Sequence, residues 1–378
     1  MRIETTPIFD GLRKAIRKVI QKNSFNSLSG LEAISKVDGF SPKEINQMNI
    51  WEEFKELGVP GYSIPLVDGG YELGQDVTIM ICEEMGEAIF QHPYIETMIA
   101  ADILSQSNTE SRYDEKLRRI ITGDLFIGVL GVEDKLNNLV IEKTTDGWNI
   151  NGTTQFVSNI DLLDSLILIV DDYVFEVPKD RCGIFIKSYE NIVQSNLYKI
   201  NLENLKVSDI DRVNKNVLDL NRIKARARLR QASYLLGLSK GTLTEATNYV
   251  NTRTQFGKKL IEYQSIEFKL ASILAQLEAA KLKIQNTAWL DDHNQQCILQ
   301  SATESLAYIG EIALLTSRET LHLHGAFGMT KLSKIEKYYR CIALESSRNG
   351  TINNLWLEAG RLKIDSYKNQ SLLATRTF

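Results

Sequence analysis

The sequence has little cysteine and little histidine. Its 378 residues include four cysteines, which lie far apart at positions 82, 182, 297 and 341. Cysteines without paired spacing do not form a disulfide framework, so we expect reduced thiols and a cytoplasmic location. The four histidines have no metal-ligand spacing. His322 and His324 are two positions apart and would point to different faces of a helix, so we expect no metal site.

Long apolar runs and an excess of one charge are also missing. No stretch approaches the roughly 20 apolar residues of a membrane span, and the longest tight run, Leu166–Val170, has the length of a strand. Lys and Arg number 44 against 48 Asp and Glu, a net charge of −4, which disfavours nucleic acid as a partner. An apolar content of 43% excludes a largely disordered chain. No glycine-rich turn links a strand to a helix, which disfavours a Rossmann dinucleotide site.

Helical periodicity dominates residues 1–120. Apolar residues recur every three or four positions at Leu12, Ala15, Ile16 and Val19. A second stripe of this kind contains Ile79, Cys82, Met85 and Ile89. This spacing predicts amphipathic helices, and we interpret residues 1–120 as an N-terminal helical domain.

The period changes over residues 121–222. Short β-rich runs occur there at Leu125–Leu130, Gly147–Ile150, Gln155–Ser158, Leu166–Val170 and Gly183–Ile186. Asp, Asn and Gly turns separate these runs at intervals of about ten residues, which favours a small barrel or sandwich over alternating strands and helices. We therefore predict a central β domain.

Residues 223–378 are again predicted to be helical. Apolar residues spaced alternately by four and three form a seam at Ile266, Leu270, Ile273, Leu277, Ala280 and Ile284. The pattern continues at Leu299, Ala302, Leu306, Ile309 and Ala313. Such stripes with short connections predict an antiparallel four-helix bundle, whose seam we place in the core of the chain. The fold class is therefore α+β, with a helical domain, a β domain and a helical bundle in that order.

Several motifs resemble those of the acyl-CoA dehydrogenase family. Arg253–Lys258 is similar to the family's arginine-x-x-phenylalanine-glycine segment. The downstream signature is matched in register by His324–Thr330, Tyr339–Arg340 and Gly350–Thr351. Weaker matches lie at Leu57–Gly70, Glu83–Gly86 and Phe156–Asn159. The resemblance covers essentially the whole chain and implies a flavoprotein that holds FAD between the β domain and the bundle.

The resemblance also assigns cofactor contacts by position. Around the flavin ring, Phe156 would lie against the ring and Ser158 would form a hydrogen bond near N5, while Thr351 and Asn353 would contact FAD beside the active-site loop. Arg253 would bind the pyrophosphate, which suits the bidentate guanidinium. The contacts implied near the adenine half come from Phe256, Leu260 and Gln264. From another subunit of a homotetramer or homodimer, the implied contacts come from His322 and Gly325.

The family's usual catalytic base is missing. A glutamate normally removes the α-proton of an acyl thioester, most often from the position that is Asn349 here. In a minority of members it stands beside an arginine that corresponds to Arg228, where this chain has Ala227. Neither an amide nor a methyl group accepts a proton at neutral pH. Glu345 is the nearest carboxylate in the sequence and is an alternative base. The chain is thus an atypical member by resemblance.

A second departure lies in the β domain. Gly131–Asp134 replaces the family's threonine-glutamate-proline, and the glycine-serine-aspartate that should follow is absent. The loop that normally contacts the flavin and the acyl carrier is therefore shortened.

Three functions remain open from the sequence. The first is α,β-dehydrogenation of an acyl group on CoA or a carrier protein, with hydride transfer to flavin N5 and electrons passed to an electron-transfer flavoprotein or O₂. The second is another flavin reaction on this fold, such as oxygenation, which needs no α-proton base. The third is a non-catalytic subunit that completes the FAD site of a partner.

Overall fold

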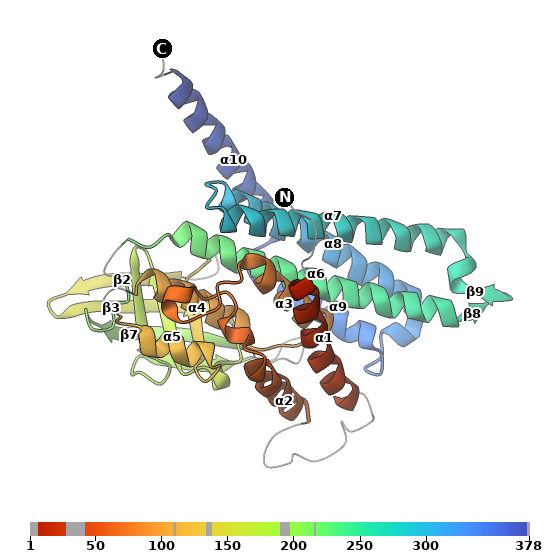
Figure 1. Ribbon diagram of the computed structural model, residues 1–378, viewed down its shortest axis with the longest axis horizontal. Coiled ribbons are helices and arrows are strands. Elements are labelled where there is room, and N and C mark those ends of the chain that lie inside the picture. The colour runs from red at the N-terminus through yellow and green to blue at the C-terminus, as the bar shows by residue number, and fades with distance from the viewer. Residues whose placement is uncertain are drawn as a thin grey trace.

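A computed structural model of the chain describes residues 7–27, 42–108, 111–133, 138–189, 197–214 and 217–375. Helices come first, two β-sheets follow, and long helices complete the described chain. Figure 1 shows the strands gathered at one end of an elongated molecule, with long helices running from them to the other end. The predicted α+β fold class is confirmed.

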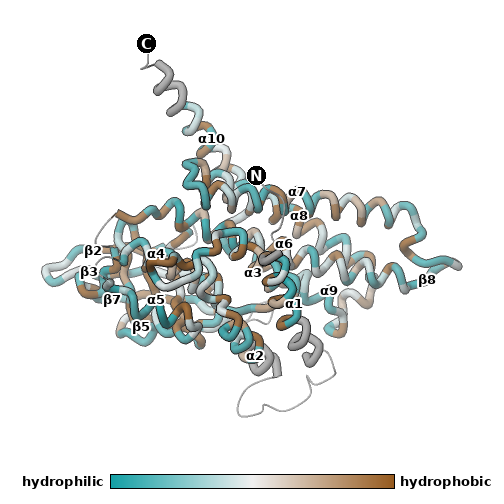
Figure 2. The backbone as a smooth tube through the Cα atoms, in the orientation of Figure 1, coloured by the Kyte–Doolittle hydropathy of each residue, from teal (hydrophilic) through white to brown (hydrophobic). Residues whose placement is uncertain are grey.

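The N-terminal region consists of helices, one of which, α4, is largely buried. They are α1 (Pro7–Ser27), α2 (Pro42–Glu56), α3 (Gln75–Glu87), α4 (Tyr94–Gln106) and α5 (Asp114–Ile121), with short 3-10 turns η2 (Val59–Gly61) and η3 (Leu66–Asp68). Nine of the thirteen residues of α4 are buried. Figure 2 shows α4 as a largely hydrophobic segment near the middle of the β-domain side of the molecule. A helix that is apolar on most sides must be enclosed by other elements.

The strands form two main sheets that share a small core of their own. One sheet has the order β1-β4-β5 and contains β1 (Ile127–Leu130), β4 (Ser165–Val170) and β5 (Tyr173–Pro178). The other has the order β2-β3-β7-β6 and contains β2 (Asn138–Thr144), β3 (Gly147–Ser158), β7 (Leu197–Val207) and β6 (Ile184–Ser188). Apolar side chains of both sheets pack together. The apolar run predicted as a strand at Leu166–Val170 is β4, and Leu166, Ile167 and Leu168 are fully buried.

The end of β3 is irregular. Its register with β7 shifts between Thr154 and Val157, just before Ser158 closes the strand. Asn159 follows with a positive φ of 52° and starts the turn η5 (Ile160–Leu162). A bulge redirects the side chains that follow it, so the local sequence at this strand end decides the direction in which Ser158 points.

The long helices form the other half of the molecule. They are α6 (Leu220–Thr252), α7 (Gln264–Asp292), α8 (Ile298–Gly328), α9 (Lys334–Glu345) and α10 (Ile352–Thr375). Between α6 and α7 lie the two-residue strands β8 (Thr254–Gln255) and β9 (Lys258–Lys259) and the turn η6 (Leu260–Glu262). The predicted seam of α7 is largely buried in the main core, through Leu270, Ile273, Leu277, Ala280 and Ile284. In Figure 1 the β8–β9 hairpin projects at the end opposite the sheets, and α10 extends away from the body.

Helices α3 and α6 cross with their backbones almost in contact. A Cβ atom added to Gly237 would lie 1.9 Å from the carbonyl oxygen of Glu83, and one added to Gly86 would lie 2.1 Å from that of Tyr234. The two glycines therefore face each other's helix, and this crossing holds α6 against the N-terminal domain. Only a residue without a Cβ atom permits this approach.

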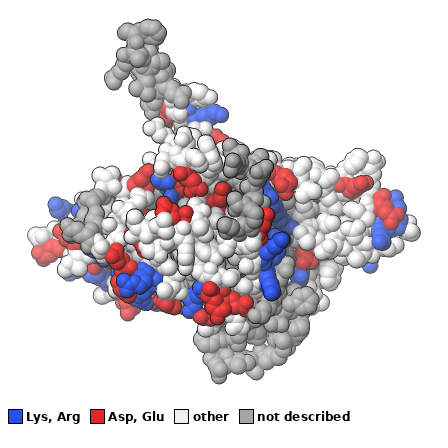
Figure 3. Space-filling model, viewed as in Figure 1, with Lys and Arg blue, Asp and Glu red and all other residues white. Residues whose placement is uncertain are grey.

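Charge is distributed over the surface in both signs. The face in Figure 3 carries Lys and Arg side chains interspersed with Asp and Glu, without an extended region of one sign. Among the described helices, none carries the long apolar stretch that a bilayer crossing would need.

Candidate functional site

A cavity of about 150 Å³ lies where the three parts of the fold meet. It is bounded by α3 and α4, by β1 and the end of β3, by α6, and by the turn between α9 and α10. A cavity of this size holds a group about as large as benzene. Its apolar wall includes Met85, Ile99, Leu130, Val157 and Leu163. One side of the cavity is therefore suited to an apolar group.

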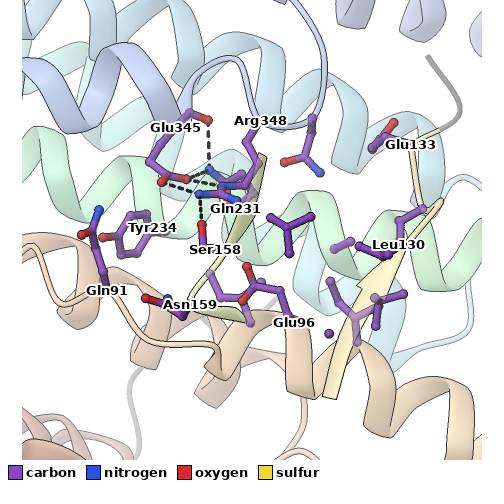
Figure 4. A pocket seen from close by; sticks show the side chains of 18 of the residues that line it. Gln91, Glu96, Leu130, Glu133, Ser158, Asn159, Gln231, Tyr234, Glu345 and Arg348 are labelled. Atoms are coloured by element: carbon purple, nitrogen blue, oxygen red, sulfur yellow. Dashed lines mark hydrogen bonds and ion pairs between the residues drawn. The ribbon is translucent and has the colours of Figure 1, made fainter. Parts of the chain in front are cut away.

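Arg348 and Glu345 form a buried ion pair on the other side of the cavity. Nε and Nη2 of Arg348 donate to the two carboxylate oxygens of Glu345 at 2.6 and 2.8 Å. Gln231 on α6 donates to the same carboxylate at 2.9 Å, and Arg348 also donates to Ser158 Oγ at 2.9 Å. Figure 4 shows these four side chains linked in one cluster at one side of the cavity. Burial opposes ionisation of Glu345, but Arg348 and Gln231 outweigh it and lower the pKa of this carboxyl.

A second arginine holds a second cavity carboxylate. Nε and Nη2 of Arg228 donate to the two oxygens of Glu133, each at 2.8 Å. The same guanidinium also donates to Glu358 at 2.9 Å and to Thr303 Oγ1 at 2.6 Å. Glu133 lies in the segment where the family has threonine-glutamate-proline. Arg228 therefore joins the end of β1 to α8 and α10 and does not point a free guanidinium into the cavity.

Three polar groups that face the cavity lack such partners. Asn349 Oδ1 and the Tyr234 hydroxyl have no hydrogen-bond partner within the described part of the chain. Among the described residues, Glu96 on α4 has no arginine or lysine bound to its carboxylate. Burial raises the pKa of Glu96, although the Arg348 charge opposes this shift. These groups give the cavity unused hydrogen-bonding capacity, which an apolar ligand alone would not satisfy.

The residues predicted to surround the flavin ring lie at or near this cavity. Ser158, Asn349 and Glu345 line it. Thr351 precedes α10, where its hydroxyl accepts a hydrogen bond from the backbone of Asn354 at 3.3 Å, and Asn353 is exposed on the first turn. Phe156 belongs to β3, but its side chain lies outside the described residues.

The residues predicted to bind the rest of FAD lie elsewhere. Arg253, Phe256 and Leu260 are on the β8–β9 hairpin and the turn after it, and Gln264 begins α7. His322 and Gly325 are exposed near the end of α8, where His324 stacks on Tyr249 of α6. Figure 1 places this hairpin at the end of the molecule opposite the sheets. One chain therefore does not bring the two predicted groups together.

Both groups nevertheless suit the parts of FAD implied for them. Near the ring, Ser158, Asn349 and Tyr234 offer polar atoms beside an apolar wall. On the hairpin, Phe256 is 94% exposed, and Arg253 forms no ion pair with any described residue. An exposed aromatic ring beside an unpaired guanidinium can stack on a base and hold a pyrophosphate. The residues present therefore fit the cofactor, provided that a second copy supplies the hairpin.

Four side chains that line the cavity were not predicted from the sequence as site residues. Arg348 directly precedes the family base position, so its place in the sequence was a usable signal. Gln231 and Tyr234 lie one and two helical turns beyond Ala227 and share its face of α6. Glu96 carries no local signal, because only the packing of α4 brings it to the cavity.

His92 lines the cavity and makes the stability of the protein depend on pH. Its ring stacks on Trp51 with 4.0 Å between centroids, and burial lowers its pKa to about 3. An unfolded histidine binds a proton below about pH 6.5, so the unfolded state takes up the proton first as pH falls. The contribution of neutral His92 to the free energy of unfolding is therefore fully present above that pH. It decreases by about 1.4 kcal/mol per pH unit as pH falls toward the folded-state pKa.

We expect His92→Phe to flatten this dependence. Urea unfolding at about pH 7 and about pH 5 should give a larger loss of unfolding free energy for the wild type than for the variant, by about 1–2 kcal/mol. Equal losses in the two proteins would show that His92 is protonated in the folded state.

Comparisons with known proteins agree with the motifs. The family described as "Acyl-CoA dehydrogenase, C-terminal domain" matches residues 222–361. Caffeyl-CoA reductase-Etf complex subunit CarC of Acetobacterium woodii is 26% identical over 91% of this chain and 96% of its own length. The 3-(aryl)acrylate reductase of Clostridium sporogenes is 25% identical over 92% of this chain and 91% of its own length.

The same architecture occurs among solved structures. Butyryl-CoA dehydrogenase of Megasphaera elsdenii superimposes with a TM-score of 0.79 over 96% of this chain and 100% of its own, at 18% identity. The match extends over the helical domain, the sheets and the bundle. Residues 222–361 therefore match the C-terminal domain of acyl-CoA dehydrogenases, and the whole chain is similar in sequence and fold to members of that FAD-dependent family, as its motifs predicted.

Proposed function

We propose that this protein binds FAD with the flavin ring beside Ser158, and that it transfers a hydride between an acyl thioester and that cofactor while a proton moves between the thioester and a protein group. The observation that carries this proposal is the cavity between the three parts of the fold, in which an apolar wall faces unsatisfied polar groups. FAD supplies the hydride acceptor at N5 when it is bound. With a saturated acyl thioester as substrate, the reaction is α,β-dehydrogenation, in which a proton leaves Cα and a hydride leaves Cβ.

The chain's own residues would orient the thioester. The apolar wall suits the acyl group, and the side-chain amide of Asn349 suits the carbonyl oxygen of the thioester as a hydrogen-bond donor. Glu345 is disfavoured as the base, because both of its oxygens are bound by Arg348 and one of them by Gln231 as well. Asn349 at the usual base position accepts no proton. The proton must therefore move through another group.

A complete FAD site would require a second copy of the chain. Arg253 and Phe256 lie at the β8–β9 hairpin, at the end of the molecule opposite the sheets, so a neighbouring copy would present them to the pyrophosphate and adenine. Exposed apolar side chains on α7 and α10, among them Phe268, Leu274 and Ile364, support contacts between copies. We therefore propose a homodimer or homotetramer. As electron acceptor we propose an electron-transfer flavoprotein or O₂, and as acyl carrier CoA or a carrier protein.

Reduction of an α,β-unsaturated thioester is the second candidate. Two relatives that align with more than nine-tenths of this chain are named as reductases, one of them as a subunit of a complex with Etf. Reduction uses the same geometry, with hydride and proton moving in the opposite direction. The site needs no further residue for it.

Absorption spectroscopy of the purified protein tests the proposal. We expect a flavin spectrum and an assembly larger than one chain by light scattering. Under anaerobic conditions, butyryl-CoA or 3-phenylpropionyl-CoA should bleach the oxidised flavin, whereas cinnamoyl-CoA should reoxidise chemically reduced flavin if reduction is the physiological direction. A protein that stays colourless with added FAD would indicate a non-catalytic subunit. If only NAD(P)H bleached the flavin, and O₂ then gave an oxygenated product, the protein would instead catalyse a flavin-dependent oxygenation.

A further inference from the structure

Three carboxylates face the cavity in the described part of the chain, and two of them are held by arginines. Glu345 is bound through both oxygens by Arg348, and Glu133 is bound through both oxygens by Arg228. A carboxylate held in this way accepts a proton only at the cost of a buried ion pair. Glu96 is the remaining one, and it is not bound to an arginine or a lysine.

The position of Glu96 directs its carboxylate to the place where a substrate would lie. It is in the first turn of α4, between Ile95 and Ile99, and all three residues line the cavity. In the view of Figure 4, Arg348, Glu345 and Gln231 lie above the cavity and Glu96 lies below them. A ligand in the cavity beside Ser158 would therefore have Glu96 as its neighbour.

The surroundings of Glu96 tune it for proton transfer. Burial raises its pKa, while Arg348 and the carboxyl's own backbone N–H oppose the shift and Glu345 adds to it. The titratable groups around Glu96 come from three places. Glu345 ends α9 and Arg348 lies in the turn after it, Tyr234 is on α6, and His92 lies just before α4. A general acid or base works best when its pKa approaches the working pH, and glutamates reach that range by burial.

The other titratable groups of the cavity are less suitable. Burial raises the pKa of Tyr234 well above its ordinary value, so this phenol stays protonated and can only donate. His92, with a pKa of about 3, is too weak a base at neutral pH. The arrangement leaves Glu96 as the group that can exchange a proton with a bound ligand.

We propose that Glu96 is the catalytic acid–base residue of this site, acting from α4 in place of the glutamates missing at Asn349 and Ala227. In dehydrogenation its carboxylate takes the proton of the breaking Cα–H bond. The electron pair left on Cα forms the Cα=Cβ double bond, and the hydride of the breaking Cβ–H bond reduces FAD. In reduction the neutral carboxyl returns the proton to Cα. This inference rests on the proposed function.

The test compares Glu96→Gln with Glu96→Asp and with Glu115→Gln, a surface control on α5. We expect all three variants to retain FAD and to bind butyryl-CoA, as judged by perturbation of the flavin spectrum. In Glu96→Gln, reduction of FAD by butyryl-CoA should slow by about 10²–10⁴-fold. Glu96→Asp should recover part of this loss, and Glu115→Gln should behave as the wild type.

Two measurements independent of turnover complete the test. Exchange of the α-hydrogen of butyryl-CoA with D₂O, followed by mass spectrometry, should disappear in Glu96→Gln. As pH is lowered, the infrared band of a protonated carboxyl should gain a component in the wild type that is absent in Glu96→Gln, even without substrate. Unchanged exchange, or the same carboxyl band in both proteins, would overturn the role of Glu96.

Different results would contradict the proposed function and the role of Glu96. If the wild type takes up no FAD and neither thioester bleaches it, the proposed function fails and the role of Glu96 fails with it. If the wild type is reduced by butyryl-CoA and Glu96→Gln is reduced equally fast, only the role of Glu96 fails.

Discussion

Replacing Arg348 with alanine should lower the free energy of unfolding by about 3–5 kcal/mol at neutral pH, because it leaves the buried carboxylate of Glu345 unpaired. Glu345 is 5% exposed and receives two hydrogen bonds from Arg348. Gln231 is the partner that would remain, and one neutral amide does not replace a guanidinium. Urea unfolding at a fixed FAD concentration measures the change.

The loss should depend on pH in a defined direction. In the wild type the pKa of Glu345 is lowered, so its stabilisation is present above the unfolded-state pKa of about 4.3 and is lost as pH falls through the folded value. In Arg348→Ala the buried carboxyl has no cation, and its pKa should rise. The difference between the two proteins should therefore be largest at neutral pH and become smaller in acid.

Two further variants distinguish the effect of leaving Glu345 unpaired from the effect of removing an ion pair. Glu345→Met with Arg348→Met removes both charges and should recover most of the loss, because an apolar pair of similar volume replaces a buried ion pair well. Arg118→Ala removes an exposed partner of Glu115 and should change stability by at most about 1 kcal/mol. A loss in Arg348→Ala no larger than that of Arg118→Ala would contradict the importance of the buried pair.

Gly237→Ala should cost at least about 3 kcal/mol, or prevent the protein from accumulating in a folded form. The added Cβ atom would lie 1.9 Å from the Glu83 carbonyl oxygen and 2.8 Å from the backbone nitrogen of Glu87. Both obstacles are backbone atoms of α3, so no side-chain rotation relieves the clash. The helices must separate along their whole interface, which opens a densely packed core.

Thermal unfolding and the soluble yield measure this effect. Gly360→Ala on α10 is the matched control, since nothing lies within 4 Å of its added Cβ atom. There alanine should leave stability unchanged or raise it by about 0.5–1 kcal/mol through helix propensity. If Gly237→Ala unfolded at the wild-type temperature, α3 and α6 would not be in the close contact described.

Much of the fold follows from local patterns. The stripe through Leu270 and Ile284 predicted a helix whose seam is buried, and the apolar run at Leu166–Val170 predicted a buried strand. Both patterns lie within a single segment of the chain, so they can be identified without knowing which other element that segment packs against. The motif at Arg253–Lys258 likewise indicated a resemblance to acyl-CoA dehydrogenases, because its spacing is local.

Less of the candidate site could be predicted from the sequence. Glu345 was proposed as a base from its distance to Asn349 along the chain, but that distance carries no information about Arg348 folding back on it. Glu96 lies some 250 positions before Asn349 in the sequence, and only the packing of α4 against the β domain brings both to one cavity. The protonation behaviour of each depends on these long-range neighbours.

The amino-acid sequence by itself determined the α+β architecture, the resemblance to acyl-CoA dehydrogenases and the absence of a glutamate from the two usual base positions, because these depend on periodicity and on residue identity at motif spacings. Tertiary structure alone decided which carboxylates are bound by arginines, which one faces the cavity without such a partner, and that the hairpin lies at the end opposite the sheets. The physical reason is that burial and charge pairing depend on distances in space between segments that are remote in the chain.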